Sequence, residues 1–221
     1  MLSSIIGSVT IVADPITGCQ TNERRINMLF SDVDAIAKAA SNKAELCNNH
    51  FGKYFMRSIM AGFYIVVATI LSNVSAAVLL PTYPQFGKLL GAFLFSIAIV
   101  LVVFMGGELF TGNNMVMTEG SLNKGISSKD MCKVWIYSYI GNLLGSILVA
   151  VLFVGSGLVS QGPVMEFFAT TSIVKSSDPF MQRIFRGILC NILVCVAVLC
   201  SFRTSDDSAK LIMIFYIYLH L

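Results

Sequence analysis

The residue types best suited to chemistry lie together in one short segment, GGELFTGNNM, at residues 106–115. The segment follows residues 89–105, an apolar run without charge. Inside hydrocarbon, backbone N–H and C=O groups need partners, so a helix broken there must be buried in protein or border a wet cavity. A helix that starts at such a break directs free amides into the cavity, where they attract anions. The segment therefore predicts an anion site at a broken helix, with an ordinary cytoplasmic loop as the alternative.

Four side chains of this segment have expected roles. Glu108 is expected to fix the turn by accepting hydrogen bonds from backbone N–H groups, and Thr111 offers a hydroxyl that donates or accepts. Leu109 and Phe110 project as an apolar constriction. The glycines around them supply the backbone freedom that a sharp turn requires.

Other kinds of chemistry find little support in the sequence. The six cysteines form no C-x-x-C pair, and only two histidines are present, so the spacing of a zinc site is absent. No Ser-His-Asp or Cys-His arrangement is visible, and we expect neither an enzyme nor a cofactor. The net charge is +3 and the basic residues are scattered, which argues against a nucleic-acid partner.

The composition points to lipid as the surrounding solvent. Of 221 residues, 56% are hydrophobic and only 12% are charged, half the charged fraction of an average globular domain. Apolar runs predict an all-α membrane protein with spans near residues 58–80, 89–105, 134–158 and 184–202. A last run, residues 209–221, is shorter than the ~20 residues that a spanning helix needs.

Basic residues in the short loops set the expected orientation. Lysines and arginines gather before the first span and after the second and fourth spans. Because such residues favour the cytoplasmic side, we expect a multi-pass protein of the cytoplasmic membrane with a cytoplasmic N-terminus. The loop that carries Lys175 then faces outward.

Four stretches resemble one known family. GGELFTGNNM resembles the G-x-E-L-F-T-[GS]-[NS] signature of the formate/nitrite transporter family. WIYSYIGNLLGS (135–146), RGILCNILVCVAV (186–198) and SDDSAKLIMIF (205–215) are similar, in the same order, to its third, fourth and fifth helices. The resemblance covers about residues 30–221.

The resemblance implies an architecture and partners. It implies a homopentamer in the lipid bilayer, in which each protomer has its own pore and an aquaporin-like bundle of six helices in two inverted repeats. The second helix of each repeat is broken by a loop. The chain then divides into an unassigned segment (1–31), an amphipathic cytoplasmic helix (32–57), a first three-helix repeat (58–158), an outer linker (159–182) and an incomplete second repeat (183–221).

The resemblance also implies a path for the substrate. Leu109 and Phe110 fall at a hydrophobic slit on the outer side, and Phe95 and Ile99 fall at an inner slit. On generic grounds, apolar residues of any span are more often packing or lipid-facing residues. The implied pore residues are Phe95, Ile99, Glu108, Leu109, Phe110, Thr111, Lys175, Asn191 and Val194.

Three of these residues belong to the outer mouth. Lys175 falls where a vestibule lysine attracts anions, although a lone loop lysine is ordinarily only solvated. Asn191 falls where an asparagine faces that vestibule, and Val194 lies one turn deeper. Asn142, in the third span, is interpreted as one of the small and polar residues that join membrane helices.

The family's central histidine has no counterpart in the sequence. Its G-F-E-H-S-like motif is absent, and the role is not assigned to His220. We therefore expect a chain truncated in its second repeat. The predicted function is passage of small monovalent anions, formate or nitrite, with a hydrosulphide channel or a non-conducting remnant as alternatives.

Overall fold

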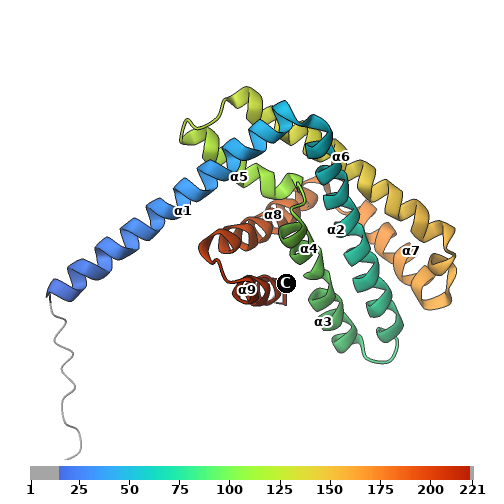
Figure 1. Ribbon diagram of the computed structural model, residues 1–221. Coiled ribbons are helices and arrows are strands. Elements are labelled where there is room, and N and C mark those ends of the chain that lie inside the picture. Colours follow the sequence, from blue (N-terminus) through green and yellow to red (C-terminus); the bar gives the residue numbers. More distant parts are fainter. Residues whose placement is uncertain (1–14, 220–221) are drawn as a thin grey trace, which may run out of the picture.

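The computed structural model describes the backbone of residues 15–219 and the side chains of residues 31–217, and in that part of the chain every regular element is a helix (Figure 1). The expected all-α class is therefore confirmed. The predictions for His220 and for residues 1–14 lie outside the described residues. In chain order the elements are α1 (Pro15–Asn49), α2 (Phe51–Leu79), α3 (Pro84–Phe95), α4 (Ile97–Met105), α5 (Phe110–Leu122), α6 (Ser128–Gly155), the short 3-10 helix η1 (Leu158–Ser160), α7 (Gly162–Ser177), α8 (Phe180–Arg203) and α9 (Asp207–Leu219).

Four helical stretches among the described residues are long and apolar enough to cross a bilayer. They are α2, the stretch Pro84–Met105 formed by α3 and α4, α6, and α8. Each coincides with an expected span, and the prediction of several membrane helices is confirmed. Between α3 and α4 the helix is interrupted only at Ser96.

The N-terminal helix is longer than the sequence patterns suggested. Pro15 begins α1, as a proline at the first helical position can, because its fixed φ suits a helix and its missing N–H has no partner there in any case. The expected helix at 32–57 lies partly in α1 and partly in the first turns of α2. In Figure 1, α1 extends away from the body at its N-terminal end and crosses α5 at its C-terminal end.

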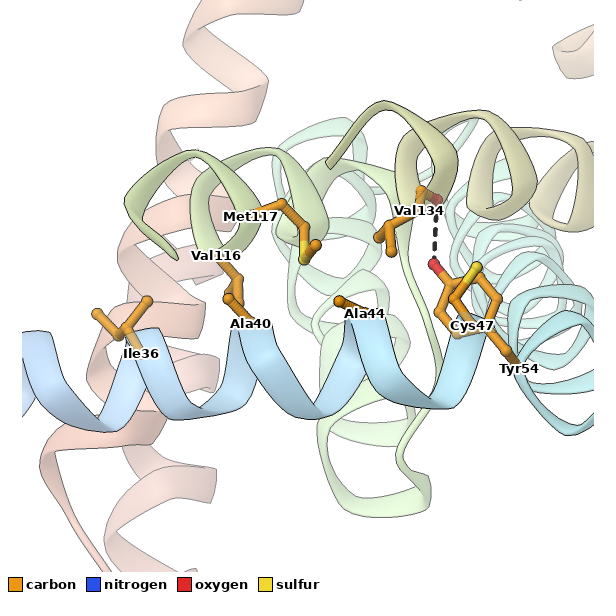
Figure 2. Close-up of a cluster of buried hydrophobic side chains, with 8 residues drawn as sticks. All are labelled: Ile36, Ala40, Ala44, Cys47, Tyr54, Val116, Met117 and Val134. Atoms are coloured by element: carbon orange, nitrogen blue, oxygen red, sulfur yellow. Dashed lines mark hydrogen bonds between the residues drawn. The ribbon is translucent and has the colours of Figure 1, made fainter. Parts of the chain in front are cut away.

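The C-terminal half of α1 is fixed by an apolar cluster. Ile36, Ala40, Ala44 and Cys47 recur every three or four residues and so share one face of the helix (Figure 2). That face packs on α5 and α6, whose buried members are Val116, Met117 and Val134. The phenol of Tyr54, at the start of α2, donates a hydrogen bond to the Val134 carbonyl oxygen at 3.0 Å.

Glycines bring α2 and α6 unusually close together. A Cβ added to Gly145 would lie 1.9 Å from the Ile59 carbonyl oxygen, and one added to Gly62 would lie 2.0 Å from the Asn142 carbonyl oxygen. Small residues at four-residue spacing allow such contacts between membrane helices. The close approach also places the Asn142 side chain against the segment that follows α4.

The rest of the surface agrees with a lipid environment. Ile140, Leu144, Ile147 and Val151 leave 41–63% of their surface exposed along α6. The segment expected as an outer linker, 159–182, contains the helix α7, which packs against the far end of α2. These features describe a multi-pass membrane bundle in which α1 covers one end and the α2–α3 turn and α7 form the other.

Candidate functional site at the broken helix

The helix of the second span is broken as the sequence predicted. After Met105, Gly106 adopts a left-handed conformation with φ +67°, which suits glycine, and the Gly106 and Gly107 N–H groups both donate to the Val102 carbonyl oxygen. The chain becomes helical again at Phe110, the first residue of α5. The alternative of an ordinary loop through residue 114 is wrong, because α5 already contains the buried residue Asn113.

Asn142 of α6 supplies hydrogen-bond partners to the break. Its Nδ2 donates to the Glu108 carbonyl oxygen at 3.0 Å and to the Ser58 carbonyl oxygen at 2.7 Å, and its Oδ1 accepts from the Phe110 N–H at 2.8 Å. The Glu108 N–H donates to the Arg57 carbonyl oxygen. Three backbone groups at the break, the N–H and C=O of Glu108 and the N–H of Phe110, thus find partners on α2 and α6, as apolar surroundings require.

The Glu108 carboxylate pairs with a lysine from outside the membrane spans. Lys43 Nζ of α1 lies 2.6 Å from Glu108 Oε2, and only 6% of the glutamate side chain is exposed. The expected backbone N–H partners are replaced, among the described residues, by this ammonium group. The ion pair joins α1 directly to the break.

Beneath the break lies a buried polar network. Asn113 Nδ2 donates to the Tyr54 phenol oxygen at 3.2 Å, and the Trp135 indole N–H donates to the Asn113 carbonyl oxygen at 3.3 Å. Because each buried polar group has a partner, the start of α5 is held in one position relative to α2 and α6.

Four of the predicted path residues meet in one apolar cluster. Ile99 and Val194 are buried together with Ala197 and Ile214, and Phe95 and Leu109 pack against them. Thr111 lies in the first turn of α5 and is partly buried. The structure thus joins α3, α4, α8 and α9 around the residues expected to form slits.

The arrangement of these residues differs from the one expected for the two slits. Phe95 lines a cavity together with Lys175, whereas the break with Leu109 lies near Arg57 at the α1 end, so Phe95 and not Leu109 lies on the side of Lys175. The reason is chain direction, because α3 starts at the far end of α2 and α4 returns toward α1. Phe110 is not part of the apolar cluster that contains Leu109. Its ring packs edge-on against that of Tyr139, with the two ring centroids 5.4 Å apart.

Asn191 does not share the cavity of Lys175. It lies in a groove between α5 and α8, beside Asn114 and Thr118, and its Oδ1 accepts a hydrogen bond from the Cys195 thiol. Consecutive helical residues point about 100° apart. The rotation of α8 therefore places Cys190, rather than Asn191, in the cavity of Lys175.

A cavity of about 280 Å³ lies directly beside the break. Lys43 and Arg57 supply its basic groups, Glu108 supplies its carboxylate, and Leu109 and Phe202 are among its apolar walls. The described residues contain no group of three histidine, cysteine or acidic side chains arranged for a metal ion.

Sequence reasoning missed several residues of this site. Asn142 was interpreted only as helix packing, and Lys43 and Arg57 belong to the basic residues before the first span, which served only to set the orientation. A signal was present for Asn142, because an amide in the middle of an apolar span needs partners. No local pattern could reveal its partner Glu108, which lies 34 residues away.

Comparison with known proteins adds independent evidence. A family described as "Formate/nitrite transporter" matches residues 31–221. The uncharacterized transporter YwcJ of Bacillus subtilis is 34% identical over 159 residues, covering 72% of this chain and 62% of that protein. The nitrite transporter NirC of Escherichia coli is 34% identical over 187 residues, covering 83% and 68%. The chain thus spans about two thirds of these relatives' lengths.

Solved structures show the same fold. A chain titled "FNT family ion channel" matches with a TM-score of 0.78 at 32% identity, covering 86% of this chain and 74% of that one. A structure titled "Pentameric formate channel with formate bound" matches with a TM-score of 0.65 at 28% identity, covering 76% and 68%. The likeness includes the helical bundle described above.

Proposed function

The chain belongs to the formate/nitrite transporter family, and from that premise we propose that it passes small monovalent anions, formate or nitrite, across the cytoplasmic membrane. Names of similar proteins support this choice, since they include a nitrite transporter and a formate channel. We further propose a homopentamer with a cytoplasmic N-terminus, by analogy with the pentameric formate channel and from the lysine and arginine distribution.

One observation carries the proposal: the helix break, in which Glu108 is buried, is held by hydrogen bonds to α2 and α6 and is bordered by a cavity with basic residues. Asn142 and the Arg57 carbonyl hold the break, and Lys43 and Arg57 face the cavity. Irregular backbone at membrane depth is tolerated where it is buried or lines a water-filled space. The basic groups favour an anion there over a cation.

The path then leads through apolar surroundings. We propose that anions reach Phe95, Ile99, Leu109 and Val194 from either end, with Lys175 attracting them at the end opposite α1. Stripping water from an anion between such side chains is costly. A species that crosses as its neutral conjugate acid avoids this cost, and Thr111 offers a hydroxyl near the constriction.

Flux into proteoliposomes tests the function. The purified chain should take up labelled formate faster than protein-free liposomes, and competition with nitrite and hydrosulphide should rank the substrates. Thr111→Val should reduce uptake with little loss of assembly, and Lys175→Ala should reduce it most at low salt, where screening is weak. Uptake no faster than in protein-free liposomes would contradict the proposal.

A further inference from the structure

A second cavity, of about 440 Å³, lies at the end of the bundle opposite α1. It lies between α2, α3, α7 and α8, and Phe95 forms part of its wall. Two lysines from different elements line it: Lys88, in the second turn of α3, and Lys175, in the last turn of α7. Only Lys175 was expected from the sequence to act there.

The two positive charges lack an acidic counterpart within the cavity. No carboxylate is among the residues that line it, and neither lysine forms an ion pair with another described residue. The nearby Glu166 lines an adjoining cavity with Pro163 and Thr170 instead. Like charges that share one space repel each other, and an anion between them removes that repulsion.

The polar groups in the cavity wall differ in whether their hydrogen-bond donors already have a partner in the protein. The Ser72 and Thr69 hydroxyls each donate to a backbone carbonyl oxygen, those of Gly91 and Ile65, at 2.7 Å. Asn73 is partly buried, lines the same cavity, and makes no side-chain hydrogen bond with the described residues. Its amide N–H groups are therefore available to a ligand.

We propose that Lys88 and Lys175 together hold one small oxyanion at this mouth, with the Asn73 amide as a neutral donor, before the anion passes Phe95. The identity of the anion rests on the proposed function. The new elements are the second cation, Lys88, and the donor Asn73. Because the lysines come from α3 and α7, the site exists only when both of these helices are packed against α2.

Cys190 provides a native reporter for this cavity. Its thiol is exposed and lines the same space. In phospholipid-free micelles, its rate of modification by the anionic reagent 2-sulfonatoethyl methanethiosulfonate is compared with that by the cationic trimethylammonioethyl analogue. Mass spectrometry reads each cysteine separately, and Cys132, near the α1 end, serves as the internal reference.

Lys88→Ala should lower the rate of the anionic reagent at Cys190 by up to about fivefold, as loss of a unit charge about 4 Å away in water would, and should raise the rate of the cationic reagent, so that the ratio of anionic to cationic rates falls. Lys175→Ala should do the same, and Lys88→Arg should retain most of the ratio. Lys53→Ala, at the start of α2, should leave it unchanged. An unchanged ratio in Lys88→Ala would overturn the proposal.

Nitrite protection identifies the occupant. Nitrite should slow anionic modification of Cys190 in the wild-type chain, less in either lysine variant, and less in Asn73→Leu although that change leaves the charge ratio intact. Protection by added phosphatidylglycerol but not by nitrite would overturn the small-anion assignment in favour of a lipid phosphate. These readouts do not depend on flux, so a chain that conducts no anion but shows them would contradict the proposed function alone.

Discussion

At the scale of single residues, the site depends on two side chains that bind the break from other helices, Asn142 and Lys43. Asn142 uses both of its N–H groups and its oxygen on main-chain atoms of α2, the break and α5. Lys43 reaches from α1 to the carboxylate of Glu108. Both contacts join segments far apart in sequence, so a change at either residue should affect the position of the break.

Asn142→Leu should destabilise the protein, because it leaves three backbone groups without partners. Each buried unsatisfied group costs about 1–3 kcal/mol, so a loss of at least about 3 kcal/mol is expected. Thermal unfolding in detergent measures it, with the exposed residue Asn123→Ala as a control that should change little. A midpoint equal to that of the wild-type chain would show that the Asn142 bonds do not hold the break.

The Lys43–Glu108 ion pair should respond unequally to removal of its two members. Lys43→Met leaves a carboxylate that is almost fully buried, and breaking a buried pair in this way costs about 3–5 kcal/mol. Glu108→Leu leaves a lysine that is already 20% exposed and can turn toward water, so its cost should be smaller. The double variant should recover much of the Lys43→Met loss; strictly additive losses would contradict a direct pairing.

At the scale of elements, the membrane-spanning helices were predictable and their contacts were not. Apolar runs located α2, the α3–α4 stretch, α6 and α8, because a membrane span must be long and apolar. The glycines near residue 106 correctly predicted the turn at the break. The rotation of α8, which turns Asn191 away from Lys175, depends on packing with α5 and α9, and no pattern within one helix encodes it.

Gly145→Ala should disrupt the packing of α2 on α6. The added methyl group would overlap the Ile59 carbonyl oxygen, a backbone atom that cannot move alone, and overpacking typically costs about 1–3 kcal/mol. Gly155→Ala, at the open end of the same helix, meets no atom within 4 Å. Unfolding in detergent should separate the two variants clearly, and equal stability would argue against the close approach of these helices.

At the scale of the whole molecule, the C-terminal half of α1 is an integral part of the bundle. Its buried face includes Cys47, which is 1% exposed, whereas Cys132 of α6 is exposed. The amphipathic pattern predicted a helix here, yet not its partners, since Val116 and Val134 lie in other parts of the sequence.

Burial raises the pKa of the Cys47 thiol, so at pH 8 this residue should react with a maleimide far more slowly than Cys132. The raised pKa also makes the stability of the folded chain depend on pH. An unfolded thiol loses its proton near pH 8.5, and deprotonation then favours unfolding, so the contribution of Cys47 is present below that pH and is lost above it. Mass spectrometry gives the labelling rates; equal rates at the two cysteines would mean that α1 detaches.

The central claim is that the broken helix borders a water-accessible route for anions, and Thr111→Cys tests it most directly. In proteoliposomes, a small anionic thiol reagent should modify this cysteine at a measurable rate well below that of the exposed Cys132, and formate should slow the reaction. A residue at position 111 that never reacts would contradict the account. So would one that reacts as fast as Cys132 and does not respond to formate.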